Sequence, residues 1–310
     1  MTKRMVDFLI IGGGPAGIAA GIYACQDKAN FLLIEEKQNC WFMKESVNSH
    51  YFVDGFTGSK KKVTGSDLQR KFMKHYLRLG GGTLKEKVLS LNKKNNKFVV
   101  KTNKSNIYAE TVILASGTKP KKLYIDNINR FKDQIHFDCT IDGKKYINKN
   151  IIVVGGRNSG SVAACYLYDL GCKPTLLELQ KELPAKDKYQ KWLAQRKIRI
   201  LTSAKLVKIW GEKKLQQAVV KLDKQDKIIN IATTGIFVYI GRQANLDFLK
   251  IHLKKNKEGH LLVNYFNQTS CSGLFAAGDV TCKLKQIITA CGDGANAYYF
   301  AKKYLESKLK

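Results

Sequence analysis

The stretch DFLIIGGGPAGIAAGIYACQ, residues 7–26, decides the fold of this chain. An apolar run of strand length passes into a glycine turn and then into an alanine-rich stretch typical of a helix. Gly12 would make the tight turn, Gly14 would let the backbone approach a pyrophosphate, and Gly17 would let the helix pack on the strand. The next strand, NFLLIEE, ends in Glu35, about 20 residues after the turn, where a carboxylate suits ribose hydroxyls. We therefore predict a dinucleotide-binding βαβ unit.

A second copy of this unit follows in the middle of the chain. NIIVVGGRNSGSVAACYLYDLG, residues 150–171, repeats the strand, turn and helix, and KPTLLELQ supplies the closing strand. Arg157 stands where the first turn has its middle glycine, so a ligand approaches the backbone less freely, although an arginine can contact a pyrophosphate by charge. Glu178 follows the turn at the spacing seen in the first unit. That spacing favours a second dinucleotide site over a decayed fold.

The two glycine turns belong to different domains, because a domain's length of sequence separates them. After residue 240 the chain gives SGLFAAGDV, a further buried strand, and we expect a last helix from about Gln286 to Lys308. The economical arrangement inserts the second domain into the first, with GTKPKKLY and GRQANL as linkers. We predict an α/β fold of two Rossmann-like domains, with segments 1–118, 119–242 and 243–310.

The composition fits an ordinary globular protein. The chain has 310 residues, of which 44% are hydrophobic and 25% are charged. The longest apolar runs have strand length, far short of the ~20 residues that span a bilayer, and the N-terminal run passes into glycines rather than a cleavage site. The eight cysteines include no Cys-x-x-Cys and no zinc-type spacing. We expect a cytoplasmic protein with no membrane span and no metal site.

The net charge of +29 has two interpretations. It would attract an acidic partner, such as an electron-carrier protein, a nucleic acid or an anionic membrane. It also fits a compositional bias towards lysine, since the lysines are scattered along the whole chain. We favour the bias, because no motif that reads RNA or DNA accompanies the charge, and we expect no nucleic-acid partner.

Seven motifs carry a family resemblance over nearly the whole chain: IIGGGPAG, LLIEE, TVILASGTKP, IIVVGG, GIFVYIG, GLFAAGDV and KQIITACGDGANA. Together they resemble the low-molecular-weight thioredoxin reductase family, which includes the flavoprotein subunit of alkyl hydroperoxide reductase. The resemblance implies a homodimer, with an FAD-binding domain in residues 1–118 and 243–310 and an NAD(P)-binding domain in residues 119–242. It assigns FAD to Gly12, Gly14, Pro15, Ala16, Gly17, Glu35, Asn48, Gly117, Gly278, Asp279, Gln286 and Ile287. It assigns the nicotinamide nucleotide to Gly155, Gly156, Ser159, Glu178 and Gly241.

Three departures from the family pattern matter. In HFDCTIDG, residues 136–143, Asp138 and Ile141 stand where the family has its redox-active cysteines. Cys139 lies between them and has no neighbouring thiol with which to close a disulfide. The loop KQNCWFMKESVN lacks the family's Gly-Gly-Gln near the flavin, and LLELQKELPAKD lacks the arginine cluster that is typical of NADPH binding. We therefore assign no catalytic residue.

These features predict an FAD-dependent NAD(P)H oxidoreductase that passes electrons from the flavin directly to an external acceptor, without an internal disulfide. The acceptor would be a small molecule or an acidic protein. Glu178 slightly favours NADH over NADPH, because a carboxylate accepts ribose hydroxyls and repels a 2′-phosphate.

Two alternatives stay open at this stage. Ferredoxin or flavodoxin–NAD(P) reductases of this architecture also lack the cysteine pair, but they carry an additional C-terminal segment, whereas this sequence ends after its last helix. The other alternative is a non-catalytic flavin-binding sensor or scaffold.

Overall fold

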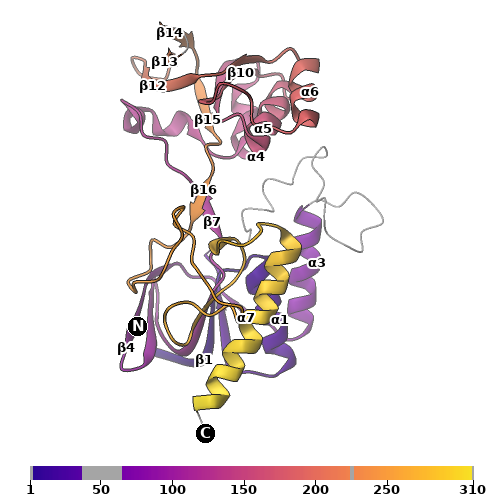
Figure 1. Cartoon of the computed structure of the whole chain (residues 1–310), viewed down its shortest axis with the longest axis vertical. Coiled ribbons are helices and arrows are strands. Elements are labelled where there is room, and N and C mark those ends of the chain that lie inside the picture. The colour runs from indigo at the N-terminus through magenta and orange to yellow at the C-terminus, as the bar shows by residue number, and fades with distance from the viewer. Residues whose placement is uncertain (1–2, 37–64, 224–226, 309–310) are drawn as a thin grey trace. The chain divides into compact units, whose positions relative to one another are not determined.

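The computed structural model describes residues 3–36, 65–223 and 227–308 (Figure 1). The chain divides into two compact units. Unit 1 comprises Met1–Lys119 and Gln243–Lys310, and unit 2 is Pro120–Arg242, so one unit is inserted into the other. Unit 2 begins one residue later than the sequence-based segment 119–242 and ends at the same residue.

Unit 1 is built on a seven-stranded sheet in the order β3-β2-β1-β6-β5-β4, with β17 paired to β6. The pairs β1/β2, β1/β6, β2/β3 and β6/β17 are parallel, whereas β4/β5 and β5/β6 are antiparallel. Parallel strands buried on both faces account for apolar runs such as DFLII. The strands are β1 (Lys3–Ile11), β2 (Phe31–Ile34), β3 (Thr83–Leu84), β4 (Val88–Lys94), β5 (Lys97–Thr102), β6 (Asn106–Leu114) and β17 (Leu274–Ala276).

Three helices of unit 1 pack together: α1 (Pro15–Gln26), α3 (Gly65–Arg78) and α7 (Ile287–Lys308). Figure 1 shows them side by side, with α1 in contact with both others. A Cβ atom on Gly294 of α7 would lie 2.0 Å from the carbonyl oxygen of Ala16, so only glycine permits this helix crossing. The core beneath contains the fully buried Ile10 and Tyr76. Each such apolar side chain contributes ~1.5–3 kcal/mol to folding.

Unit 2 carries a parallel sheet in the order β11-β10-β9-β15-β8, together with an antiparallel sheet β12-β13-β14. The parallel strands are β8 (Ile135–His136), β9 (Asn150–Val154), β10 (Lys173–Leu177), β11 (Arg199–Leu201) and β15 (Gly235–Val238). The antiparallel strands are β12 (Ala204–Trp210), β13 (Gln217–Leu222) and β14 (Lys227–Ala232). The helices are α4 (Cys139–Asp142), α5 (Asn158–Asp169) and α6 (Asp187–Gln195).

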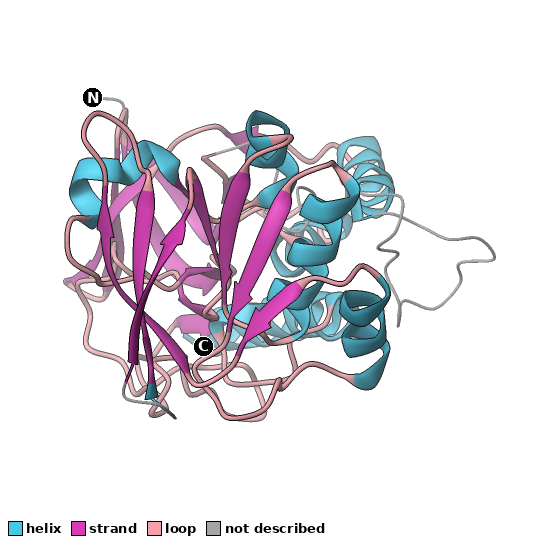
Figure 2. Cartoon of the chain, turned by 90° about the horizontal axis from the view of Figure 1, so that it is seen from above, coloured by secondary structure: helices cyan, strands magenta, loops and turns pink. Residues whose placement is uncertain are grey.

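The two linkers between the units pair as a short ladder of β7 (Thr118–Pro120) and β16 (Arg242–Ala244). Three 3-10 helices complete the described elements: η1 (Ile128–Gln134), η2 (Gly143–Tyr146) and η4 (Gly278–Val280). Strands and helices occur throughout both units, so the α/β fold class predicted from the sequence is confirmed (Figure 2). Among the described helices, none combines the length and apolar character needed to cross a bilayer.

Candidate functional site

The first glycine turn joins β1 to α1, and the protein's own packing explains two of its glycines. Gly12 has φ of 113°, and a Cβ atom there would lie 2.3 Å from the carbonyl oxygen of Ala115. A Cβ atom on Gly17 would lie 1.7 Å from the carbonyl oxygen of Gly12. Both distances are far below van der Waals contact, so the turn closes only with glycine at these positions.

Gly14 differs from those two glycines, because nothing in the protein excludes a side chain there. Its φ of −76° and ψ of −175° are open to any residue, and a Cβ atom would meet no atom within 4 Å. The open space faces the N-terminus of α1, where Pro15 occupies the first turn and main-chain N–H groups favour anions. This opening fits a phosphate-bearing ligand that approaches the backbone closely, as FAD would.

Glu35, at the end of β2, is tied to the same turn. Its Oε2 accepts a hydrogen bond from the main-chain N–H of Gly13 at 2.6 Å. A cleft of about 360 Å³ lies beside it, within the size range of small-molecule sites. The cleft is lined by Ile11, Gly12, Ile34, Glu35, Glu36, Glu86, Lys87, Val88, Leu89, Ser116, Asn245, Asp247 and Phe248. Gly12 of the turn and Glu35 therefore line one cleft.

Most of that lining was missed by reasoning from the sequence. Glu86, for example, accepts hydrogen bonds from Thr102 at 2.5 Å and from Ser105 at 2.6 Å. Burial acts to raise the pKa of Glu86, but these two hydrogen bonds, with the charges of Arg4 and Lys104, lower it overall. No motif marks these positions, because Glu86 before β4 and Ser105 after β5 lie in loops that meet only when the two strands pair.

The second glycine turn joins β9 to α5 and repeats the first. Gly155 has φ of 105°, and a Cβ atom there would lie 2.4 Å from the carbonyl oxygen of Tyr239. A Cβ atom on Gly160 would lie 1.8 Å from the carbonyl oxygen of Gly155. Gly160 is thus the counterpart of the close-packing glycine in the first turn. It was not among our sequence-based site residues, although its spacing within GGRNSG was the signal that could have found it.

Glu178 takes the part in unit 2 that Glu35 takes in unit 1. Its Oε2 accepts from the N–H of Gly156 at 2.6 Å, and its Oε1 accepts from the N–H of Gln180 at 2.9 Å. The side chain is only 6% exposed, so both contacts fix its orientation. Ser159 lies exposed in the first turn of α5.

Arg157 occupies the position that corresponds to Gly14. Its φ of −71° and ψ of 179° nearly match those of that glycine, so the turn keeps its course and gains a side chain. The side chain is exposed, and its guanidinium group makes no hydrogen bond or ion pair with another residue that the structure describes. A free positive charge therefore stands at the N-terminus of α5.

The other predicted FAD positions lie at strand and helix ends of unit 1. Gly117 and Gly278 have φ of 60° and 72°, and Gly278 packs against α1, where its Cβ atom would lie 3.0 Å from Cβ of Ala16. Asp279 lies in η4, and Gln286 and Ile287 lie at the start of α7. Gly241 of the predicted nucleotide set has φ of 97° and directly precedes β16. Asn48 and the loop KQNCWFMKESVN lie outside the described residues.

The cysteine of KQIITACGDG is a poor nucleophile. Burial raises the pKa of Cys291 to about 11, so its thiol stays protonated near neutral pH. This agrees with our decision to assign no catalysis to it.

The segment at the expected redox position is built as a short capped helix. Asp138 caps α4: its Oδ1 accepts from the N–H of Thr140 at 3.0 Å and from the hydroxyl of Thr140 at 2.7 Å. Its Oδ2 is buried and has no hydrogen-bond partner among the described residues. Ile141 is 51% exposed, whereas Cys139 is 6% exposed and is not part of a disulfide. Thiol–disulfide exchange at these positions has no second sulfur to use.

A buried polar chain that we did not predict supports this segment. His136 Nε2 lies 2.6 Å from the hydroxyl of Tyr146, and His136 Nδ1 lies 3.1 Å from Asp142 Oδ2. Burial lowers the pKa of His136, partly offset by the charge of Asp142. Burial and the same carboxylate raise the pKa of Tyr146 to about 12. The chain therefore holds a neutral histidine between a phenol and a carboxylate in the interior of unit 2.

Comparison with known proteins agrees with this geometry. The pyridine nucleotide-disulphide oxidoreductase family matches residues 6–294. The 34.2 kDa protein in the rubredoxin operon of Clostridium pasteurianum is 29% identical over 310 residues, which cover 99% of each chain. A subunit of the alkyl hydroperoxide reductase of Staphylococcus epidermidis is 31% identical over 314 residues, which cover 98% of this chain and 60% of that protein.

Among solved structures, the thioredoxin reductase of T. acidophilum has a TM-score of 0.86 and 27% sequence identity, and the match covers 98% of this chain and 99% of that one. The order of the motifs, the two glycine turns and these similarities all indicate the same family. The chain therefore belongs to the pyridine nucleotide-disulphide oxidoreductase family, as a thioredoxin reductase-like, FAD-dependent enzyme that uses a pyridine nucleotide.

Proposed function

We propose that this enzyme passes electrons from NAD(P)H through FAD directly to an external acceptor, without an internal disulfide. The observation that carries the proposal is the α4 segment. Asp138 there is a helix cap, Ile141 is an exposed apolar side chain, and Cys139 is a buried single thiol. In both glycine turns a glutamate still accepts a hydrogen bond from a main-chain N–H, which supports nucleotide binding. The α4 segment, by contrast, has no cysteine pair with which to carry out disulfide chemistry.

Unit 1 would hold FAD. The opening beside Gly14 would admit the pyrophosphate to the N-terminus of α1, and Glu35 would accept the ribose hydroxyls. The remaining positions proposed for FAD are Gly12, Pro15, Ala16, Gly17, Asn48, Gly117, Gly278, Asp279, Gln286 and Ile287. FAD identified in the denatured, gently purified protein would support this assignment, whereas FMN or no flavin would contradict it.

Unit 2 would hold the nicotinamide nucleotide through Gly155, Gly156, Ser159, Glu178 and Gly241. Two main-chain N–H groups, those of Gly156 and Gln180, hold the carboxylate of Glu178 in one orientation beside the turn. A carboxylate there accepts the ribose hydroxyls of NADH and repels the 2′-phosphate of NADPH. Lys181 and Lys186 are exposed nearby in sequence and would soften that repulsion only as flexible point charges. We therefore propose a preference for NADH, tested by kcat/KM for both donors with one artificial acceptor.

Hydride transfer from nicotinamide to flavin is the chemistry that the two cofactors supply when bound. This chain would contribute binding and orientation, through the two turns and their acids, and it has no cysteine pair at the family's redox positions 138 and 141. The acceptor would therefore take electrons from the flavin itself. It would be a small oxidant or a protein carrier. An acidic protein carrier would be attracted by the net charge of +29, although we favour a compositional bias as the origin of that charge. We propose a homodimer as the working assembly.

One observation favours a second function. Arg157 stands at the place where the first turn leaves an opening, so the second turn is less accessible to a pyrophosphate. A unit 2 that binds no nucleotide would make the protein a flavin-binding sensor rather than a reductase.

Anaerobic mixing with NADH separates the two functions. The reductase predicts that the flavin absorption band bleaches on mixing with NADH, and more slowly with NADPH. Dithionite, which reduces flavin without a protein site, provides the control for a competent flavin. If dithionite bleaches the band and neither nucleotide does, the sensor is the better account.

A further inference from the structure

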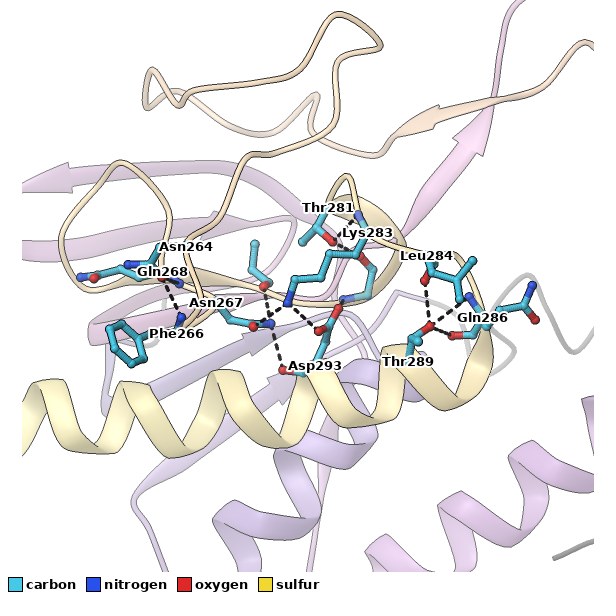
Figure 3. Close-up of polar contacts among 12 residues, drawn as sticks. Asn264, Phe266, Asn267, Gln268, Thr281, Lys283, Leu284, Gln286, Thr289 and Asp293 are labelled. Carbon is cyan, nitrogen blue, oxygen red and sulfur yellow. Dashed lines mark hydrogen bonds and ion pairs between the residues drawn. The ribbon is translucent and has the colours of Figure 1, made fainter. Parts of the chain in front are cut away.

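A polar cluster of Asn267, Lys283 and Asp293 lies in unit 1 (Figure 3). Lys283 Nζ donates to Asp293 Oδ1 at 2.7 Å and to Asn267 Oδ1 at 2.8 Å. Asn267 Nδ2 donates to the carbonyl oxygens of Ala276 and Asp293 at 3.1 and 3.2 Å. Asn267 is fully buried, and Asp293 is 8% exposed. The cluster thus pairs a nearly buried carboxylate with one lysine.

The second carboxylate oxygen of Asp293 faces the turn at Gly278, which we propose as part of the FAD site. Its Oδ2 accepts from the main-chain N–H of Gly278 at 3.4 Å. Gly278 has φ of 72° and packs on Ala16 at the N-terminus of α1, so this turn joins α7 to the first helix. Asp293 therefore connects Lys283 on one side with the start of η4 on the other.

The segment between η4 and α7 brings Lys283 to the carboxylate and is itself well anchored. The Thr281 hydroxyl donates to the carbonyl oxygen of Gly278 at 2.9 Å, and the Thr289 hydroxyl donates to the carbonyl oxygens of Leu284 and Gln286 at 2.7 and 2.8 Å (Figure 3). The lysine side chain consequently extends from a backbone held at both ends. The ion pair therefore costs mainly the rotamer freedom of the lysine side chain, because its backbone is already held.

A buried carboxylate without a cation is costly, and it also repels other anions. Asp279, next to Gly278, places a second carboxylate in the same turn. Without Lys283 the turn would present uncompensated negative charge to a dinucleotide that carries a pyrophosphate. With Lys283 in place, the charges of Lys283 and Asp293 nearly cancel, and Asp293 can still accept the hydrogen bond from the Gly278 N–H.

We infer that Lys283 is a positioning residue for the dinucleotide of unit 1: it neutralises Asp293, so that this carboxylate fixes the Gly278 turn without repelling the ligand. The inference rests on the proposed function, because it takes FAD as the ligand of unit 1. It adds a residue that the family resemblance did not assign and that touches the FAD positions only through another side chain.

The test is a double-mutant cycle on the full-length chain, with the dissociation constant of FAD measured by fluorescence after removal of the bound flavin. Lys283→Met should weaken FAD binding about tenfold or more, since it leaves the carboxylate unpaired. Lys283→Met combined with Asp293→Asn should bind within about threefold of Asp293→Asn alone, because the repelling charge is gone. Lys283→Arg, which keeps the cation, should bind within about threefold of the parent protein.

Lys302→Met is the matched control. Lys302 also lies on α7 and pairs with a carboxylate, Asp27, at 2.8 Å, but both partners are more than one-third exposed. It should leave FAD binding unchanged. If Lys283→Met reduces the yield of folded protein, Lys283→Gln replaces it in the same cycle.

The inference is wrong if the double variant binds FAD as weakly as Lys283→Met, since the lysine would then act without Asp293. It is equally wrong if Lys283→Met binds FAD as the parent does. Failure of the proposed function is distinguishable, because the parent protein itself would then bind no FAD.

Discussion

The two glycine turns, one in each unit, can be compared directly because they share the same backbone course. Both close over a glycine with positive φ, both pack a second glycine on the carbonyl oxygen of the first, and both bind a glutamate at 2.6 Å. Within the motifs GGGPAG and GGRNSG they differ at three positions, and at one of these a glycine, Gly14, is replaced by a charged residue, Arg157. The backbone is nearly the same at both, so packing does not require glycine there. The shared glycines serve the fold, and we propose that the position of Gly14 and Arg157 serves the ligand.

The two units also differ in how many departures from the family pattern they carry. The departures from the family pattern that fall on described residues lie in unit 2, in the α4 segment and in the stretch after β10. Unit 1 keeps the opening, the acid and the cleft within its described residues. Under the proposed function, the described part of the proposed flavin site is the better preserved of the two, and the described changes would concern how electrons arrive and leave.

The largest expected effect tests the claim that packing fixes the shared glycines. Gly17→Ala and Gly160→Ala each place a Cβ atom within 1.8 Å of a carbonyl oxygen. Each should lower the free energy of unfolding by about 3 kcal/mol or more, measured by urea denaturation of flavin-free protein. Gly292→Ala is the control, because its Cβ atom would meet no atom within 4 Å, and it should not destabilise the protein. Equal stability of all three variants would remove the basis of the comparison.

The second prediction tests whether glycine at position 14 is required by the ligand rather than by the fold. Gly14→Ala adds a methyl group to the opening, in a backbone conformation that alanine adopts easily. The flavin-free protein should be as stable as the parent or more stable by about 0.4–1 kcal/mol. FAD affinity should fall about 100-fold, or about 2.7 kcal/mol, because the methyl group keeps the pyrophosphate from the backbone. Unchanged FAD affinity would show that no ligand uses this opening.

The sequence predicted the features that depend on neighbouring residues. Strand, turn, helix and acid follow one another within each βαβ unit, so the periodicity and spacing indicate them directly. The insertion of one unit into the other was expected for a similar reason, because each linker carries its own turn signals.

The polar networks could not be predicted in this way. Lys283, Asp293 and Asn267 come from three separate segments, and the pairing of His136 with Tyr146 joins a strand to a 3-10 helix. Which polar groups meet in a core depends on how the segments pack, and no local pattern records it. The cap formed by Asp138 was missed for another reason: its position was interpreted only as a lost cysteine.

A smaller effect concerns Arg157 itself. Its guanidinium group at the N-terminus of α5 has no hydrogen-bond or ion-pair partner among the described residues and should attract the pyrophosphate of the incoming nucleotide. Arg157→Gly, which copies the first turn, should raise KM for NADH about tenfold with kcat nearly unchanged, since uniform binding is lost. The same variant should show a weaker dependence of KM on salt. A lower KM would contradict the prediction, because it would mean that the arginine obstructs the turn.

The smallest expected effect is at Cys139. Its thiol is 6% exposed, carries no disulfide and has no second cysteine at the family position, so it cannot cycle between dithiol and disulfide. Cys139→Ser should therefore change kcat with a small artificial acceptor by less than about twofold, a value within the range of minor packing effects. Neither the variant nor the parent should reduce thioredoxin at a rate comparable with that acceptor. The measurement compares NADH oxidation by the two proteins with each acceptor in turn. Rapid thioredoxin reduction by the parent, abolished in the variant, would show that a single buried thiol carries electrons and that unit 2 has kept more of its chemistry than its sequence indicates.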